Sequence, residues 1–406
     1  MLILMFLFAA FTQGPEPAAP LSLDRVVGTY IQNNLELQAA RYRLDRVRAE
    51  QIAARLRPNP GLTISAENLR LSGPTAADRL NEFGATYSET IELGGKRARR
   101  ESAAAANISV AEARFADLMR KGIAEVKRLY FDALLARYSI QIATENRETF
   151  QQLVQFNLAR FQEGAIAEAD LIKVRLERIK FDAAVKRAEL DLRRAVVEIL
   201  ERLEEPMSSR PAVIGEFEFR VLNPGIETLR QTALSERADV QAAAREIEAA
   251  RERLALENVR SKPDITPYVG YKRLANDNTV SLGVSIPLKI RDRNQAGIAR
   301  AEADARAAQA DYEVAQSHAL AEVESAYAAF ETARDQVQTF RDELLNQADE
   351  SRSIALAAYE EGAAELVALL EAQRTRAEVR QQYFRTLFDY QVSIAELELA
   401  VGREIQ

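Results

Sequence analysis

Three short segments of this chain recur in the same order about half a chain further on, and this duplication limits the possible folds more than any other feature. Two pairs are 203 positions apart and the third pair is 198 positions apart. The pairs are residues 37–40 and 240–243, residues 57–63 and 260–266, and residues 161–165 and 359–363. Three matches in one order at a nearly constant offset are hard to obtain by chance, so the chain is two tandem copies of one plan.

Each copy is predicted to fold as a helix, two strands, a very long helix, a turn and a further helix. The first helix begins at Leu23 and is expected to end near Arg57, because Pro58 and Pro60 cannot continue it. The first repeat is predicted to cover 21–205, with strands at about 61–70 and 83–93, a long helix at 94–160 and a helix at 167–203. A linker at 206–225 follows. The second repeat is predicted to cover 226–402, with strands at about 264–273 and 279–288, a long helix at 290–358 and a helix at 364–401.

The predicted long helices carry apolar residues at alternating spacings of four and three, which is the pattern of a coiled-coil seam. At 1.5 Å per residue, a helix of about 67 residues is roughly 100 Å long, and flanking helices of about 35 residues span roughly 53 Å each. Two short helices end to end therefore match one long helix. An ordinary soluble bundle is the alternative, although globular domains rarely keep unbroken helices beyond about 25 residues. Three such series are Met119, Ile123, Val126, Tyr130 and Ala133; Ile172, Leu176, Ile179 and Ala183; and Tyr383, Leu387, Tyr390, Ile394 and Leu397.

Composition argues against enzymes, metal centres and nucleic-acid partners. The chain is 47% hydrophobic and 28% charged, with no cysteine, one histidine and a net charge of -7. This mixture is typical of long helices and provides no basic field for nucleic acid. His318 is expected to be a surface or packing residue, and no cluster of His and Cys offers metal geometry. We therefore expect no cofactor, no catalytic residues and no enzymatic activity.

The first residues are interpreted as an export signal. Leu2–Phe11 is an uncharged apolar run too short to span a bilayer, and a polar, proline-rich stretch follows it up to Pro20. Residues 1–20 are therefore assigned to a signal peptide and leader. Since no other run of about 18 uncharged apolar residues occurs, any crossing of a membrane must be made by strands.

The strand-like runs alternate apolar residues with small or hydroxyl-bearing ones. The clearest run places Val280, Leu282, Val284, Ile286 and Leu288 on one face. Runs of about 9 to 11 residues with this alternation match transmembrane barrel strands, although alternation alone fits soluble hairpins equally well. The export signal and the lack of a second layer over these faces favour the membrane interpretation. Four strands cannot close a barrel, so a dimer, trimer or tetramer is required.

The order of these motifs resembles that of the TolC-like outer-membrane factors, the outer membrane efflux protein family, especially the branch paired with heavy-metal and drug exporters of the resistance-nodulation-division type. The resemblance covers about Leu21–Gly402. It implies a mainly α protein with a small β part, a tandem-duplicated coiled-coil tunnel protomer that contributes four strands to a trimeric 12-stranded transmembrane β-barrel. The motifs that carry it are residues 57–60, 89–97, 161–164, 285–288, 359–366 and 369–374.

The resemblance also implies roles for single residues. Gly164 and Gly362 would lie in the helix-to-helix turns at the periplasmic tip, where an adaptor docks. Asp170 and Tyr359 match a gating hydrogen-bond pair of the family, and Glu371 matches a carboxylate of an acidic ring. A solvated or packed helix position is an equally good interpretation of these three residues.

The resemblance also bears on the gate, where this chain departs from the family, and on the segment between the repeats. Ala364 and Ala368 replace a basic and an acidic gate residue, so the gate would be weaker or built differently. Residues 206–225 would contribute to an equatorial belt around the tunnel, with a plain linker as the alternative.

The implied function is an outer-membrane channel of a tripartite efflux system, with most of its mass in the periplasm. It would passively conduct substrates from an inner-membrane pump of the resistance-nodulation-division type and a periplasmic adaptor, the membrane fusion protein, to the cell exterior. Its partners would be two further copies of the chain, the adaptor, the pump and outer-membrane lipid. The sequence does not specify whether the substrate is a metal ion or a drug. A soluble periplasmic coiled-coil scaffold or interaction protein is the alternative, whereas a membrane-fusion adaptor would need lipoyl-like and barrel segments that the duplicated plan lacks.

Overall fold

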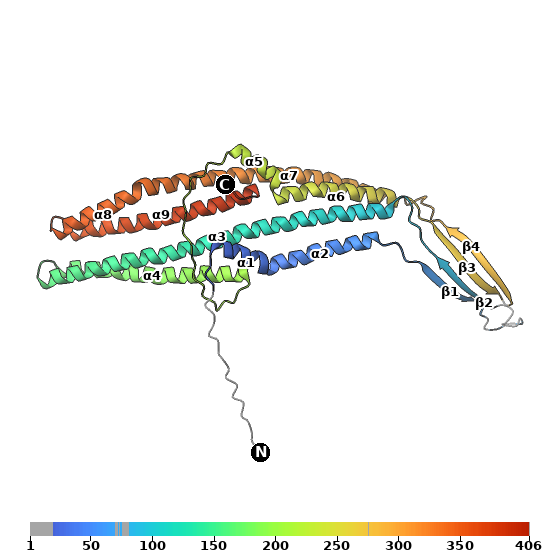
Figure 1. The fold of residues 1–406 in the computed structure, drawn as a ribbon, viewed down its shortest axis with the longest axis horizontal. Coiled ribbons are helices and arrows are strands. Elements are labelled where there is room, and N and C mark those ends of the chain that lie inside the picture. Colours follow the sequence, from blue (N-terminus) through green and yellow to red (C-terminus); the bar gives the residue numbers. More distant parts are fainter. Residues whose placement is uncertain (1–18, 70–71, 73, 75–80, 275, 406) are drawn as a thin grey trace, which may run out of the picture. The chain divides into compact units, whose positions relative to one another are not determined.

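The computed structural model describes residues 19–69, 72, 74, 81–274 and 276–405, and helices dominate it (Figure 1). Residues 1–20 are assigned to a signal peptide and leader, and of these residues 1–18 lie outside the described part of the chain. Contacts divide the chain into two compact units, each drawing on both halves of the sequence. One combines the residues up to Gln38 with 118–233 and 320–406, and the other combines 39–117 with 234–319.

The predicted duplication is confirmed, because both repeats contain the same elements in the same order. The first repeat comprises α1 (Leu23–Asn33), α2 (Leu35–Arg55), β1 (Gly61–Glu67), β2 (Glu82–Ser88), α3 (Lys96–Gln162) and α4 (Glu168–Leu203). The second comprises α5 (Ile226–Glu236), α6 (Ala238–Arg260), β3 (Thr266–Leu274), β4 (Asp277–Ser285), α7 (Gln295–Thr339), η2 (Phe340–Leu344), α8 (Leu345–Glu360) and α9 (Leu366–Val401).

The first helix is divided at Asn34, where the sequence predicted one continuous helix. The Asn34 backbone leaves the helical region with φ -59° and ψ 124°. Its side-chain oxygen accepts a hydrogen bond from the Leu37 N–H at 3.0 Å, and its side-chain nitrogen donates to the Arg202 carbonyl at the end of α4 at 3.1 Å. Asn34 therefore caps α2 and fixes the break against α4. In the second repeat Arg237 takes the same place between α5 and α6, with φ -62° and ψ 127°.

The long helices of the two repeats differ in continuity. The 67 residues of α3 are unbroken, which gives a helix of roughly 100 Å. The corresponding helix of the second repeat begins at Gln295, and a π-helical turn at Phe340–Leu344 separates α7 from α8. A π turn arises where one extra residue enters the helical hydrogen-bond ladder, so the long helix continues from Gln295 to Glu360 with an irregularity at this point. No described helix combines the length and apolar composition that a bilayer crossing requires.

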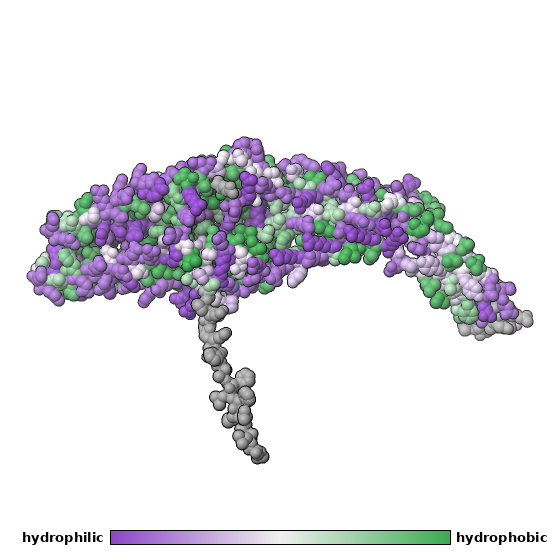
Figure 2. Space-filling view, viewed as in Figure 1, coloured by the Kyte–Doolittle hydropathy of each residue, from purple (hydrophilic) through white to green (hydrophobic). Residues whose placement is uncertain are grey.

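The four strands form one antiparallel sheet in the order β1-β2-β3-β4. Its register places Ile64 opposite Ala85, Ala85 opposite Tyr271, and Tyr271 opposite Val280. Directly opposed residues share a face, so the apolar series of all four strands line one side of the sheet. Figure 2 shows hydrophobic residues gathered over the strands. The exposed apolar residues of this face are Leu62, Ile64, Phe83, Tyr87, Val269, Tyr271, Val280, Leu282 and Val284.

The second strand is shorter than predicted, and Pro267 explains why. The Glu89 N–H donates to the Pro267 carbonyl at 3.2 Å, but proline has no N–H to return the bond. Pairing resumes once beyond this gap, where Ile91 and Ile265 exchange two backbone hydrogen bonds of 2.8 and 3.2 Å. The ladder is thus interrupted at its helical end.

Side chains of α3 hold the segment 206–225 in place by donating hydrogen bonds to its backbone carbonyl groups. Tyr130 donates to the Ile214 carbonyl at 2.7 Å, and Arg137 donates to the Gly215 carbonyl at 2.6 Å. Phe217 stacks on Tyr138 with ring centroids 5.4 Å apart. The segment is therefore an ordered part of the unit and not a plain linker. Beside it lies a buried apolar cluster whose largest members are Phe330, Leu387, Tyr390 and Leu397.

We predict that Asn34→Ala destabilises the fold by about 1–3 kcal/mol, because it removes a cap and leaves the partly buried Arg202 carbonyl without its donor. Asn34 is only 4% exposed, whereas its neighbour Asn33 is exposed. The measurement is denaturant unfolding followed by circular dichroism. Asn33→Ala is the matched control and is expected to stay within about 0.5 kcal/mol of the wild type. Equal effects of the two substitutions would contradict the assignment.

Candidate functional site at the two hairpin turns

Each repeat reverses direction through a glycine turn of the same geometry. Gly164 joins α3 to α4 and Gly362 joins α8 to α9, and both have φ of 75°. In the first turn the Ala165 N–H bonds to the Arg160 carbonyl at 2.8 Å and the Gly164 N–H bonds to the Phe161 carbonyl at 2.9 Å. The second turn repeats this pattern, which is the Schellman motif. No atom lies within 4 Å of a Cβ built at either glycine, so the backbone conformation, and not a lack of space, calls for glycine.

Tyr359 lies one turn before Gly362 and is buried, with 4% of its surface exposed. Its hydroxyl donates to the side-chain oxygen of Asn157 on α3. The Arg160 guanidinium lies 5.0 Å from the centre of the Tyr359 ring. Burial raises the pKa of Tyr359, and the Asp170 carboxylate raises it further against the opposing charge of Arg160. The hydroxyl therefore stays protonated and joins α8 to α3 as a donor.

Asp170 is close enough to act on Tyr359 by its charge, but the structure does not join the two residues directly. Asp170 lies in the first turn of α4 and accepts a hydrogen bond from Lys173 at 3.0 Å. The Tyr359 hydroxyl is directed instead to Asn157. The direct pair implied by the family resemblance is thus not formed within this protomer, because each group has a nearer partner.

Glu371 is an exposed residue of α9. Three positions further on, Arg374 reaches across to α4. Its guanidinium binds both carboxylate oxygens of Glu177, with Nε 3.3 Å from Oε2. The pKa of Arg374 is raised first by this hydrogen bond to Glu177, and the charge of Glu371 adds to the effect.

Glu177 is a carboxylate set into a buried helix face. Its side chain is 8% exposed, and it accepts a second hydrogen bond from Lys180 at 2.7 Å. Burial raises the pKa of Glu177, but the bonds and charges of Arg374 and Lys180 outweigh burial, and the net pKa lies below its ordinary value. Glu177 is therefore ionised at neutral pH and holds α4 to α9.

The helices α3 and α4 form the first helical hairpin, and α8 and α9 form the second. A second ion pair joins α9 to α3 of the first hairpin. Arg380 Nη1 lies 2.6 Å from Glu145 Oε2 on α3. We call the pairs Glu177–Arg374 and Glu145–Arg380 the hairpin links. Together they connect α9 with both α3 and α4.

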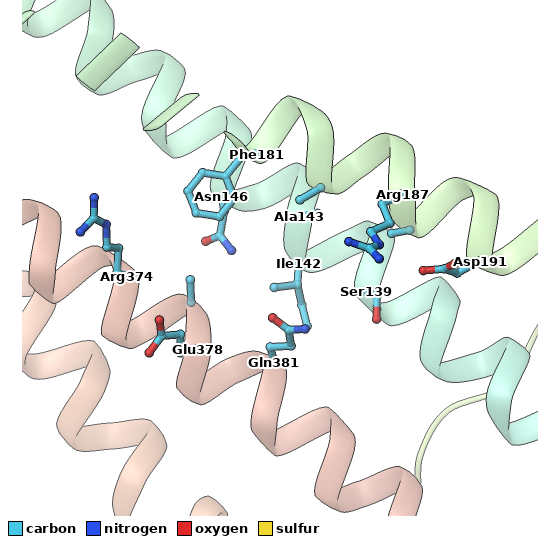
Figure 3. Close-up of a pocket in the computed structure, with 13 residues that line it drawn as sticks. Ser139, Ile142, Ala143, Asn146, Phe181, Arg187, Asp191, Arg374, Glu378 and Gln381 are labelled. Carbon is cyan, nitrogen blue, oxygen red and sulfur yellow. The ribbon is translucent and has the colours of Figure 1, made fainter. Parts of the chain in front are cut away.

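A pocket of about 340 Å³, lined by both apolar and polar side chains, lies between α3, α4 and α9 (Figure 3). Asn146 is 7% exposed and directs its amide into this pocket, where it has no hydrogen-bond partner among the described residues. Arg374 lines the pocket as well. The two hairpins therefore meet through these ion pairs and through a buried apolar cluster that includes Phe150, Val174 and Leu369. No group of three or more His, Asp or Glu side chains in the described part of the chain is placed to hold a metal ion.

On α4 the apolar series with coiled-coil spacing is exposed, and a different stripe of residues packs against the rest of the chain. Ile172, Leu176 and Ile179, which fit the coiled-coil spacing, are 46%, 53% and 53% exposed. The buried face instead contains Leu171, Val174 and Glu177. Because α4 carries two apolar stripes, spacing alone cannot tell which one packs inside the protomer. The sequence did contain one signal for the role of Glu177, because it is a charged residue in the stripe that Leu171 and Val174 begin.

The chain is similar to proteins of one kind over nearly all of its length. Residues 26–205 and 229–403 match the family of outer membrane efflux proteins. The chain is 27% identical over 390 residues to the cobalt-zinc-cadmium resistance protein CzcC of Cupriavidus metallidurans, which covers 96% of this chain and 91% of that protein. Its fold resembles CusC with a TM-score of 0.77 at 21% identity over 94% of this chain and 92% of that one. It also resembles the Campylobacter jejuni CmeC outer membrane channel with a TM-score of 0.78 at 17% identity over 99% and 93%.

We predict that Glu177→Gln weakens the fold at neutral pH but not in acid. Because the pKa of Glu177 is below its ordinary value of 4.5 in the folded chain, the ionised carboxylate contributes stability above that value, and the contribution is lost as pH falls through the lowered pKa. We expect a loss of about 1–2 kcal/mol at pH 7, since Arg374 is half exposed and the pair is partly screened.

Denaturant unfolding at pH 7 and in acid, below the ordinary carboxyl range, measures this difference. Glu189→Gln is the control, because Glu189 is an exposed residue of the same helix. A destabilisation by Glu177→Gln that persists unchanged in acid would show that shape, and not charge, accounts for the effect.

Proposed function

The chain belongs to the outer membrane efflux protein family, and from this premise we propose that it is the outer-membrane channel of a tripartite efflux system. In this proposal three copies form one tunnel, which conducts substrates passively from a periplasmic adaptor and an inner-membrane pump of the resistance-nodulation-division type to the cell exterior. Most of the mass lies in the periplasm.

The observation that carries the proposal is the exposed apolar face of the sheet. Leu282 and Ile64, on its two outer strands, are 78% and 79% exposed, and such a face is stable when it meets lipid. Lipid also demands that every backbone N–H and C=O group be paired. In the sheet order, β1 and β4 each have a neighbour on one side only. Pairing β4 of one copy with β1 of the next satisfies both strands, and three copies make a closed barrel of 12 strands.

The second apolar stripe of α4 supports the same assembly. Ile172, Leu176 and Ile179 are exposed in a single copy, and their 4-3 spacing is that of a helix seam. Packing against the helices of a neighbouring copy would bury this stripe. Residues 206–225 would surround the resulting tunnel as part of an equatorial belt.

The hairpin turns are the proposed periplasmic tip, with Gly164 and Gly362 at the adaptor-docking end. In the closed state the hairpin links hold α9 against the first hairpin, and Tyr359 and Asp170 lie at the same end of these hairpins. Glu371 contributes an exposed carboxylate that favours cations by raising their local concentration. The gate is thus built on residues other than those which Ala364 and Ala368 replace.

We assign divalent metal cations as the substrate class. The support is the similarity to a protein named for cobalt, zinc and cadmium resistance, which extends over 96% of this chain. A resistance assay in cells that lack their own metal-efflux channel tests the assignment. Restored growth on zinc, cobalt or cadmium salts is expected, and restored growth only on an organic drug would contradict it.

We predict that the exported protein is found in the outer membrane as a trimer that dissociates on heating. Membrane fractionation followed by gel electrophoresis with and without boiling measures both properties, and the purified trimer should conduct ions in a planar bilayer. A salt-extractable monomer without conductance would overturn the proposal and favour a soluble periplasmic scaffold.

We predict that breaking both hairpin links opens the channel. Each link contributes about 1–2 kcal/mol, which corresponds to a shift of about five- to thirtyfold in a two-state equilibrium. Arg374→Ala with Arg380→Ala removes both links and should therefore raise the ratio of open to closed channels in single-channel recordings by about thirtyfold or more. Arg193→Ala with Lys186→Ala is the control, because both residues are exposed on α4 away from the links.

Glu371→Gln separates selectivity from opening in the same recordings. It should lower the preference for cations without raising the open fraction, since Glu371 belongs to neither link. Unchanged open fractions in the double variant would show that the links do not hold the gate.

A further inference from the structure

The segment between β4 and α7 combines exposed aliphatic and basic residues in a place that the proposed channel mechanism does not use. Leu288 and Ile290 are 75% and 68% exposed. Lys289 and Arg293 are exposed as well. Exposed aliphatic residues next to unpaired cations suit a surface where apolar and charged surroundings meet.

The backbone brings these residues to one cavity. The Ile290 N–H donates a hydrogen bond to the Leu288 carbonyl at 2.9 Å. This bond closes a tight turn centred on Lys289. Leu288, Lys289, Ile290 and Arg293 consequently line one groove of about 650 Å³, together with Lys262 from the turn between α6 and β3. We call these five residues the rim groove.

Lys262 is held in place by two contacts from the first repeat. Its carbonyl accepts a hydrogen bond from Lys96 Nζ at 2.7 Å. Its aliphatic stem lies across Gly94, where an added Cβ would be 2.6 Å from Lys262 Cδ. The groove is therefore built from fixed backbone positions and not from mobile surface chains alone.

The neighbouring carboxylates do not neutralise the rim groove. Asp264 accepts hydrogen bonds from Lys96 Nζ at 2.7 Å and from the Leu93 N–H at 3.0 Å. Asp292 accepts one from the Asn294 N–H at 2.8 Å. The charge of Lys289 contributes to lowering the pKa of Asp264, but less than the hydrogen bonds from Lys96 and Leu93. Among the residues that the structure describes, Lys262, Lys289 and Arg293 form no ion pair, so three positive charges remain for an anion.

The corresponding place in the first repeat lacks such free charge. Lys96 is bound to Asp264, and Arg100 is bound to Glu92. The two repeats share a plan, but among the described residues the second places three cations without an ion pair in one groove beside its outer strand. The difference indicates a ligand of the second repeat and not a general property of the fold.

We propose that the rim groove binds the headgroup of an anionic phospholipid in the membrane leaflet next to the helices. The lipid phosphate lies against Lys262, Lys289 and Arg293, since clusters of basic residues at a membrane surface attract anionic headgroups. The acyl chains pass Leu288 and Ile290 and continue along the apolar face of β4, where Leu282 and Val284 are exposed. This inference rests on the proposed outer-membrane location.

The test uses the purified, detergent-solubilised trimer and fluorescent phosphatidylglycerol, with phosphatidylcholine as the uncharged comparison. The wild type should bind phosphatidylglycerol more tightly, with an affinity that falls as salt is added. Replacing Lys262, Lys289 and Arg293 with glutamine should weaken phosphatidylglycerol binding by about tenfold or more and leave phosphatidylcholine unaffected. Lys262→Arg with Lys289→Arg should retain the binding.

A triple control removes the same number of charges elsewhere. Lys186, Arg193 and Arg306 are exposed helix residues, and their replacement with glutamine should leave lipid binding unchanged. Competition by inorganic phosphate as effective as that by the lipid would overturn the proposal, because it would show a site for free anions.

The outcomes separate this proposal from the proposed function. A conducting trimer without preference for phosphatidylglycerol overturns the lipid site alone. In a further outcome, the triple glutamine variant loses the trimer while the wild type shows no preference for phosphatidylglycerol. This result would show that a neighbouring copy occupies the rim groove, and it would overturn the lipid proposal. Failure to obtain a membrane trimer at all overturns the proposed function.

Discussion

The two outer strands of the sheet impose the strongest constraint on this protein. β1 and β4 each pair on one side only, and the sheet carries a continuous apolar face. In water such edges invite pairing with other chains, and in lipid unpaired backbone groups cost several kcal/mol each. Either environment drives the strands toward further copies of the chain. The exposed stripe of Ile172, Leu176 and Ile179 on α4 leads to the same requirement from the helical side.

Duplication provides two similar halves, and the differences between them show where function has been added. The turns at Gly164 and Gly362 keep one geometry, as expected if both serve the same end of the molecule. The helices above them diverge, since α3 is unbroken whereas a π turn divides α7 from α8. π turns are frequent at functional positions. The second hairpin is therefore the half with a built-in irregularity, and it is also the half that carries Tyr359 and Arg374.

Sequence reasoning succeeded where a pattern is local. Alternation identified the four strands, and glycine spacing identified the two turns, because period and turn chemistry depend on neighbouring residues. It failed where a distant partner decides. Asn34 breaks a helix without any proline or glycine, since its cap is completed by the Arg202 carbonyl 168 positions away. Tyr359 bonds to Asn157 across 202 positions. The Glu177–Arg374 pair spans 197 positions. No local signal fixes which faces of two distant helices will meet.

In the proposed channel, the contact between the two hairpins would have to hold the gate closed without two of the charges that the family resemblance implies. Ala364 and Ala368 remove two charges at the tip, but Glu177 is buried and ionised and Arg374 binds it with two contacts. A half-exposed ion pair contributes much less than an apolar contact of the same length, and a buried apolar cluster that includes Phe150, Val174 and Leu369 also packs the two hairpins together. In the proposed channel these contacts would hold the hairpins in one arrangement, and a partner could separate them only by binding the other arrangement more tightly.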